Sequence, residues 1–520
     1  MPVLIDHERA PALLLALGVA SFAHACFVLA AIGQLRAAPL VALTGLAAFV
    51  AWKCRRALAL PREVVGGMAI GGVLLLPLAL FPPVAFDETL YHLPFVRGLA
   101  RAGSLAVFPE LRFPVFPQLH ELLCVPPYLL AGDVATHLVS VVEVLLTAAL
   151  LVEWGRRHHV RAGWLAAAIF IGSPFVVQLA TILYVDAALM LFVTAGFYAL
   201  DRQRHALAGF LLGTACGVKY LGGYFVIAAL VIVIARRRGI LAFGGACAAA
   251  ALPTTAWIFL QSGNPVFPFF GSTVWALPFP PPVAWTERIA GMVRVVWDVT
   301  FARERMNTQP PITPFLIPAV VLILVAAVRD VRARALIVVG AVYLTIFSFL
   351  PQDSRYLASL LPLVSVAAAV LVATRWPRAA TALAWLAVLP GIAYVIYRLA
   401  LQGLPPATHA EREAWLARRV PEYRAVVRAG SERVYVCGGE QLKSYAAGEL
   451  LGDFVGPYAY DRILTGAAST ADLAPRLMRI DVRYLLVAKR VCAPLHANGG
   501  MELVYEDAHA QLWRVPELRR

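Results

Sequence analysis

Apolar stretches recur along the first 402 residues, and they constrain the fold more than any other feature of this sequence. The chain is 60% hydrophobic and only 15% charged, with a mean hydropathy of +0.74, so it is far more apolar than a soluble protein of its length. Candidate spans cover residues 11–32, 37–53, 64–83, 133–154, 162–180, 183–200, 206–218, 221–235, 240–260, 313–328, 336–350, 357–374 and 380–402. Several are at the short end of the ~17–25 residues needed to cross a bilayer. The sequence predicts a polytopic α-helical membrane protein with about 13 transmembrane helices.

Basic residues alternate between the connections, which predicts the orientation because Lys and Arg in short loops stay cytoplasmic. This places the N-terminus in the cytoplasm, and it places the loops at 85–132 and 261–312 and the C-terminal region outside. The clusters are Lys53 with Arg55, Arg56 and Arg62; Arg156, Arg157 and Arg161; Arg202 and Arg204; Arg236–Arg238; Arg329, Arg332 and Arg334; and Arg375 and Arg378.

The net charge of +14 lies almost entirely in the membrane part. Residues 403–520 carry sixteen Lys/Arg and fourteen Asp/Glu, which leaves only +2 for this region. The excess is therefore explained by topology and by contact with anionic membrane lipids. Nucleic acid is not an expected partner.

Residues 403–520 form a separate small extracytoplasmic domain in this interpretation, and residues 1–402 form the membrane domain. Apolar strands are expected at 433–437 and 483–487, a helix near 440–449, and a closing hairpin from 502–506 and 511–515. Together these elements predict a mixed α/β fold. Cys437 and Cys492 share this outward region and can form a disulfide, although nothing in the sequence requires one.

An Asp87-Glu88 pair follows an apolar span and is the best clue to chemistry, because carboxylates are costly at bilayer depth. After it, Leu90, Leu93, Val96 and Ala100 share one face of a stretch that ends at Gly103, which predicts a short amphipathic helix lying on the membrane. The segment 113–121 begins with prolines and is expected to lie alongside that helix.

Taken together, five short motifs and their order resemble the GT-C superfamily of glycosyltransferases, and most nearly the protein O-mannosyltransferases and lipid A aminoarabinose transferases. One departure is that two additional helices precede the acidic loop. The resemblance extends over nearly the whole chain. The motifs are Asp87-Glu88 after an early span, Tyr184-Val185-Asp186, Gly217-Val218-Lys219-Tyr220, Gly263-Asn264-Pro265-Val266-Phe267-Pro268, and Asp353-Ser354-Arg355-Tyr356.

The two acids at the first motif can be read in two ways. Asp87 is a good N-cap for the helix that follows, but a cap contributes only ~1 kcal/mol and does not require Glu88. Adjacent helical residues point about 100° apart, so the pair cannot both face one substrate atom. The resemblance implies that Asp87 is the catalytic base and that Glu88 lies close by in a catalytic, binding or structural role.

The other motif residues also carry two interpretations each. Asp186 is either a helix cap or an acid that lines the cavity and raises the pKa of a neighbouring carboxylate. Lys219 and Arg355 either extend to the membrane interface or bind the phosphate of a donor, for which a planar guanidinium is well suited. The resemblance favours Arg355 as the phosphate ligand. We also place Tyr91, His92, His120, Tyr184 and Tyr356 among the residues that contact substrate.

The compartment constrains the donor, because an enzyme whose acids face outward needs a sugar that has already been carried across the membrane. A polyprenyl-phosphate sugar fits this requirement. The sequence therefore predicts an inverting glycosyltransferase of the bacterial inner membrane, acting on a hydroxyl of a glycan, lipid or protein acceptor. A transporter or flippase of an amphipathic lipid-linked substrate and a non-catalytic scaffold remain open.

No cofactor is expected. Asp-Glu differs from the Asp-x-Asp pattern that often holds a metal, and the histidines have no metal-ligand spacing. Metal independence is therefore favoured, with a divalent metal as the alternative.

Overall fold

The computed structural model describes residues 10–270, 284–306, 310–349, 353–453, 455–456, 463–467, 469–496 and 499–517. Residues 271–283 and 307–309 of the expected outer loop, and residue 350 of an expected span, lie outside these ranges. The chain divides into two compact units. The first comprises Met1–Leu80, Pro117–Trp257 and Phe279–Leu404, and the second comprises Phe81–Phe116, Ile258–Pro278 and Pro405–Arg520.

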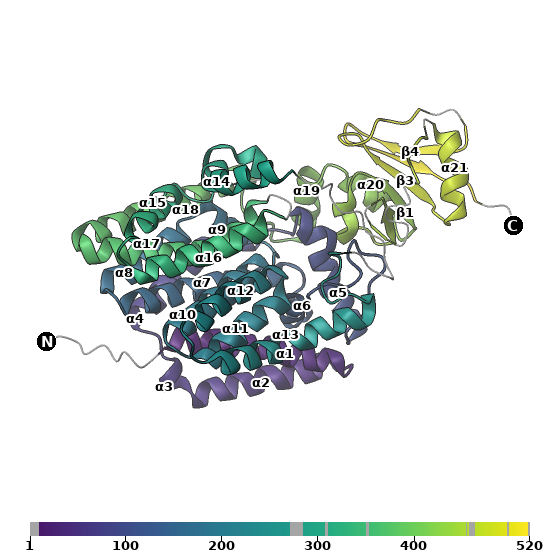
Figure 1. Ribbon diagram of the computed structural model, residues 1–520. Coiled ribbons are helices and arrows are strands. Elements are labelled where there is room, and N and C mark those ends of the chain that lie inside the picture. The colour runs from purple at the N-terminus through teal and green to yellow at the C-terminus, as the bar shows by residue number, and fades with distance from the viewer. Residues whose placement is uncertain are drawn as a thin grey trace. The chain divides into compact units, whose positions relative to one another are not determined.

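The first unit is helical, and its long helices pack side by side (Figure 1). The helices of this unit, long and short, are α1 (Pro11–Ala31), α2 (Ala37–Lys53), α3 (Arg55–Leu58), α4 (Arg62–Ala79), α6 (Leu119–Ala131), α7 (Val134–Arg156), α8 (Val160–Ile171), α9 (Pro174–Leu179), α10 (Asp186–Asp201), α11 (His205–Val218), α12 (Leu221–Ala235), α13 (Ile240–Ser262, which ends in the second unit), α14 (Trp285–Phe301), η2 (Arg303–Met306), α15 (Leu316–Ala326), α16 (Val331–Phe347), η3 (Ser354–Leu360), α17 (Leu361–Arg375) and α18 (Pro377–Gln402).

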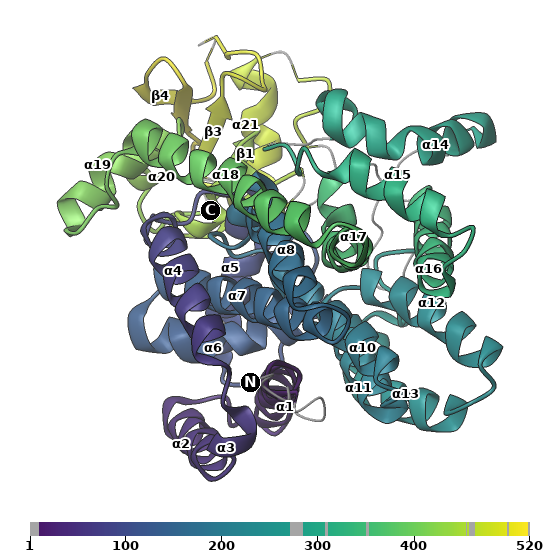
Figure 2. The ribbon, with the colours of Figure 1, turned by 90° about the vertical axis from the view of Figure 1, so that its left-hand side faces the viewer.

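Two helices form the centre of this unit. Helix α10 is buried along its whole length except for its last residue, and it packs against α7 and α11. Helix α8 lies between α7, α17 and α18 (Figure 2). Glycines allow the close crossing of α7 and α8, since a Cβ on Gly155 would lie 2.6 Å from the Cα of Gly163. In contrast, Leu40 is the one buried residue of α2, as expected for a helix that faces lipid.

Every expected span contains a helix, and those at 37–53 and 221–235 have the expected bounds. Among the described residues, six helices are long and apolar enough to cross a membrane, and several others are apolar but shorter. The span expected at 162–180 is broken into α8 and α9. Pro174 cannot continue the preceding helix, and the Ser173 side chain accepts a hydrogen bond from the Val176 amide, as an N-cap does.

Helix α6 corrects the expectation for the first outer loop. The segment from 113 onward was expected to lie alongside the amphipathic helix. Instead, residues from Leu119 form an apolar helix that packs against α1 and α7. The internal prolines Pro126 and Pro127 obscure its helical character in the sequence.

The second unit contains a five-stranded mixed sheet in the order β2-β1-β3-β5-β4. Strand β1 (Val434–Cys437) pairs in parallel with β2 (Leu450–Gly452) and β3 (Tyr484–Ala488), and β5 (Ala510–Arg514) pairs antiparallel with β3 and β4 (Glu502–Glu506). Helix α21 (Thr470–Arg479) contributes Leu473 and Leu477 to the core, which also includes Trp513. Cys437 and Cys492 form a disulfide.

The expected strands and closing hairpin are confirmed, but the expected helix near 440–449 was wrong. Only the short 3-10 helix η4 (Glu440–Ser444) forms there, and strand β2 follows it. Two helices precede the sheet, α19 (His409–Arg419) and α20 (Tyr423–Arg428). The sequence analysis had not separated these helices or α21 from the loops.

The acidic loop belongs to the second unit. A short π-helix, η1 (Glu88–His92), leads into α5 (Leu93–Ala102), which ends at Gly103 with a left-handed φ of 65°. The amphipathic helix is therefore present, but its apolar face does not lie on the membrane as expected. Leu93, Phe95, Val96 and Leu99 are at most 1% exposed because they pack inside the protein. Phe95, for example, meets the ring of Phe108 at 5.6 Å.

Candidate active site

Asp186 begins helix α10, and its carboxylate meets Lys219. The Lys219 Nζ atom lies 2.8 Å from Asp186 Oδ1, and the two side chains are 13% and 1% exposed. Lys219 follows the last residue of α11 in an extended conformation, just before α12 begins. No side chain caps the N-terminus of α10, where Asp186 is the first residue. The Asp186 carboxylate therefore serves an ion pair between two helix connections.

Arg355 and Tyr356 reach the same place from η3, more than a hundred residues later. The Arg355 guanidinium lies 4.7 Å from the centre of the Tyr184 ring, and the Lys219 Nζ atom lies 4.9 Å from the centre of the Tyr356 ring. Cation–π contacts of this kind are attractive and orient the charged group. The first unit thus brings together five of the expected site residues, which we call the charged cluster: Tyr184, Asp186, Lys219, Arg355 and Tyr356.

The η3 turn that carries Arg355 is held by its own residues. The Asp353 side chain accepts a 2.9 Å hydrogen bond from the Arg355 amide, and its second oxygen lies 3.5 Å from Arg355 Nε. The Tyr343 hydroxyl donates to the Tyr356 carbonyl oxygen. Each cation of the cluster is therefore matched by one carboxylate, and Arg355 keeps 20% of its side chain exposed.

An apolar groove begins at the same turn. Leu357 and Leu360 of η3 and Leu361 of α17 line it, together with side chains of α14, α15 and α16. The groove holds about 1050 Å³ of empty space, part of which is open to the outside. Leu357, the first residue of η3 that lines the groove, is two positions after Arg355 in the chain.

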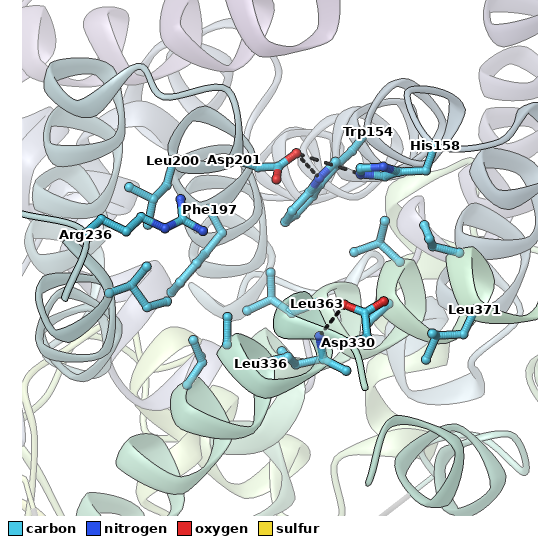
Figure 3. A pocket seen from close by; sticks show the side chains of 17 residues that line it. Trp154, His158, Phe197, Leu200, Asp201, Arg236, Asp330, Leu336, Leu363 and Leu371 are labelled. Carbon is cyan, nitrogen blue, oxygen red and sulfur yellow. Dashed lines mark hydrogen bonds and ion pairs between the residues drawn. The ribbon is translucent and has the colours of Figure 1, made fainter. Parts of the chain in front are cut away.

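A second cavity lies at the opposite end of α10 (Figure 3). Asp201 closes that end of the helix, where its carboxylate accepts a 3.2 Å hydrogen bond from Trp154 Nε1 and lies 3.8 Å from His158 Nε2. A 16-residue helix is roughly 24 Å long at ~1.5 Å per residue. This cavity is therefore separate from the charged cluster, and it lies beside the arginine-rich connections.

In the second unit, the two acids of the loop have different environments. Glu88 is fully buried, and its Oε2 atom accepts hydrogen bonds of 3.1 Å from the amides of Val84 and Ala85. Asp87 is partly exposed and makes no side-chain cap to the helix that it precedes. Glu88 therefore holds the loop, while Asp87 is the acid that solvent can reach.

Aromatic rings surround the next turn of this loop. Tyr91 and His92 are buried with ring centroids 4.3 Å apart. The Tyr91 ring meets Phe113 edge-on at 5.5 Å. Tyr91 and His92 lie four and five residues after Asp87, both on the short helix η1.

His120 was expected to contact substrate from the outer loop 85–132, but it lies within helix α6 and is buried. Its Nδ1 atom lies 3.2 Å from Glu143 of α7, and its Nε2 atom lies 3.6 Å from the Cys124 sulfur. All three side chains are at most 1% exposed. Glu143 was missed, although an acid in the middle of an apolar span is itself a signal of a buried polar contact.

Within the described ranges, no group of three or more His, Cys, Asp or Glu side chains is arranged to hold a metal ion. Metal independence stays a prediction.

Two family models match parts of the chain. The model described as glycosyltransferase family 87 matches residues 116–301, and the model described as SF2091/S2213 matches residues 411–514. The Shigella flexneri protein SF2093/S2215 is 46% identical over 41 residues. That match covers 8% of this chain and 21% of the Shigella protein, about a fifth of its length.

Solved structures resemble nearly the whole chain. The crystal structure of ArnT from Cupriavidus metallidurans in the apo state has a TM-score of 0.58 at 13% identity, covering 87% of this chain and 98% of that one. The chain has the GT-C fold. The same ArnT bound to undecaprenyl phosphate gives a TM-score of 0.54 at 14% identity, covering 88% and 99% of the two chains. Together with the match to glycosyltransferase family 87, this fold confirms the GT-C resemblance drawn from the sequence motifs, and α1, α2 and α4 precede the acidic loop.

Proposed function

We propose that this protein is an inverting glycosyltransferase that moves a sugar from a polyprenyl-phosphate donor to an acceptor hydroxyl on the outer face of the membrane. One observation carries the proposal: Arg355 and Lys219 lie together at a turn where a large apolar groove begins. This pairing of cations with an apolar groove suits an anionic lipid headgroup and its tail. The GT-C fold, the match to glycosyltransferase family 87 and the undecaprenyl phosphate bound by ArnT support it.

The charged cluster would act on the leaving group. As the bond between the anomeric carbon and the phosphate oxygen breaks, its electron pair stays on that oxygen. Fixed cations contribute most where such charge develops. Arg355 would bind two phosphate oxygens through its planar fork, and Asp186 would keep Lys219 directed toward the same site. The rings of Tyr184 and Tyr356 would hold the two cations in place.

Asp87 would supply the other half of the reaction. Its carboxylate takes the proton of the acceptor hydroxyl, and the oxygen attacks the anomeric carbon from the face opposite the phosphate. The products are a glycoside of inverted configuration and polyprenyl phosphate. Glu88 would keep the loop folded beneath Asp87, and Tyr91 and His92 would contact the acceptor. No divalent metal is required in this scheme.

The test is whether purified protein in detergent converts a polyprenyl-phosphate sugar into polyprenyl phosphate in the presence of a chelator. Asp87→Asn should lose ~10²–10⁴-fold of the turnover, as expected for removal of a general base. Asp481→Asn is the matched control, because Asp481 is exposed with a φ of 54° that asparagine also tolerates. A flippase or a scaffold would leave the donor unconsumed by every variant. Turnover of Asp87→Asn within a few-fold of the parent would remove Asp87 from the mechanism.

A further inference from the structure

Three hydrogen bonds join the segment around Asp87 to two consecutive residues of the C-terminal domain, Ser444 and Tyr445. Ser444 Oγ donates a 2.7 Å hydrogen bond to the Thr89 carbonyl oxygen, and the Tyr445 hydroxyl donates to the Pro83 carbonyl oxygen. In the opposite direction, Arg97 Nη1 donates a 2.5 Å bond to the Ser444 carbonyl oxygen. All of these residues belong to the second unit.

These bonds bracket Asp87 on both sides. Pro83 and Thr89 lie four residues before it and two residues after it, and Glu88 binds the amides of Val84 and Ala85 in between. The ordered backbone from 83 to 89 therefore depends on side chains outside the loop as well as on Glu88. To act as a base, the Asp87 carboxylate must point toward the hydroxyl of the acceptor substrate, because proton transfer requires hydrogen-bond geometry between the two groups.

Ser444 ends the short helix η4 and Tyr445 follows it, and the disulfide lies just before this helix in the chain. Cys437 ends strand β1, and η4 begins three residues later at Glu440, after Gly438 and Gly439 with positive φ values of 62° and 127°. The partner Cys492 follows strand β3, 55 residues along the chain. A disulfide persists in an oxidising compartment, which is the side where this domain is expected.

Aromatic packing supports the same contact. The Phe81 ring, just before the loop, stacks on Trp415 of α19 at 5.3 Å. The Tyr445 ring meets Tyr423 of α20 edge-on at 5.4 Å. The start of the loop and the residue that binds it are thus both fixed by helices of the C-terminal region.

We propose that Ser444 and Tyr445 are positioning residues for Asp87, and that the Cys437–Cys492 disulfide keeps them in place. The C-terminal domain then contributes to catalysis by positioning Asp87, and the proposal rests on the function proposed above. Loss of the two side-chain donors lets the 83–89 backbone fluctuate, which lowers the fraction of molecules with a correctly directed base. The step affected is turnover, because the proposed ligands of the donor phosphate, the charged cluster, are not among the residues changed.

The experiment compares full-length Ser444→Ala/Tyr445→Phe with Ser431→Ala/Tyr505→Phe. The control is matched because Ser431 is exposed and the Tyr505 hydroxyl binds Asp507 within the same domain. Two readouts are taken: amide hydrogen exchange of peptides covering 83–92, and kcat and KM for the lipid donor. Exchange in strands β1 and β3 reports whether the domain stays folded.

The test variant should exchange at least tenfold faster at 83–92 and lose at least tenfold in kcat, with the donor KM within twofold of the parent. A thiol reductant should produce the same pair of changes in the parent and none further in Cys437→Ser/Cys492→Ser. Unchanged exchange at 83–92 in the test variant would overturn the proposal, and so would faster exchange with unchanged kcat. Absence of transfer by the parent would instead reject the proposed function, and the exchange measurement would still decide whether the contact orders the loop.

Discussion

The Asp186–Lys219 pair leads to a prediction whose size follows from its geometry. At 2.8 Å, two unit charges attract by roughly 6 kcal/mol at an effective dielectric constant of about 20. Desolvation of the two groups offsets much of this gain, but removing one partner from a buried pair typically costs ~3–5 kcal/mol, because the other charge remains buried alone. We expect Lys219→Met to destabilise the protein by about 3 kcal/mol. This value is at the lower end of that range because Lys219 keeps 13% of its side chain exposed.

The double variant Asp186→Asn/Lys219→Met should recover much of this loss. Asparagine keeps the shape of Asp186 without its charge, and methionine keeps a long apolar stem against the Tyr356 ring. In a double-mutant cycle, the losses of unfolding free energy in Asp186→Asn and Lys219→Met should therefore sum to about 2 kcal/mol or more above the loss in the double variant. The assay is SDS-induced unfolding in mixed micelles at one temperature, followed by circular dichroism.

The Glu63–Arg156 pair is the matched control. Its Oε1 and Nη1 atoms are also 2.8 Å apart, but the two side chains are 50% and 20% exposed. Glu63→Gln/Arg156→Met should show a coupling of only ~0.2–1 kcal/mol, as exposed pairs do. Additive losses for Asp186 and Lys219, or equal coupling in the two cycles, would refute the argument from burial.

Three further outcomes are expected. Arg355→Lys should lower kcat/KM about tenfold or more at subsaturating donor, because an ammonium cannot form two parallel hydrogen bonds; Arg398→Lys, whose arginine also lies over a tyrosine ring, should not. Burial lowers the pKa of Lys443, while the charges of Glu110 and Glu449 act to raise it. The unfolded chain therefore holds this proton more tightly than the folded protein does. As a result, the free energy of unfolding rises with pH between the folded-state pKa and 10.5. Lys443→Met should therefore be more stable than the parent at neutral pH, with a difference in unfolding free energy that shrinks toward pH 10; a constant difference would contradict this. A reporter fused after Arg238 should stay cytoplasmic and one fused after Gly403 should be exported, and the reverse would invert the topology.

Helix positions were largely predictable, because a run of apolar residues is a local signal that a bilayer or a protein core satisfies in the same way. The bounds of α2 and α12 and the β4–β5 hairpin came from such patterns. Failures occurred where local signals conflict. Prolines inside α6 concealed a helix that its packing against α1 and α7 stabilises, and the Gly172-Ser173-Pro174 break between α8 and α9 was visible in the sequence but overlooked.

The sequence also predicted the residues of the charged cluster as site residues, but it did not predict their arrangement in space. Sequence alone left Asp186 as a cap or a site acid and left Lys219 and Arg355 as interface residues or ligands. The alternatives are equivalent locally, since a helix start suits an acid and a span end suits a cation. Only the packing of α10, the α11–α12 connection and η3 places them within contact of one another.

By itself, then, the sequence determined that the chain is a helical membrane protein with a mixed α/β C-terminal domain, because hydropathy and alternation act over neighbouring residues. The tertiary structure decided which acid of the Asp87-Glu88 pair is buried, where Lys219 directs its charge, and that Ser444 and Tyr445 reach a loop more than 350 residues earlier in the chain. Those outcomes depend on burial and on contacts between distant segments. Burial and contacts between distant segments arise only when the chain folds.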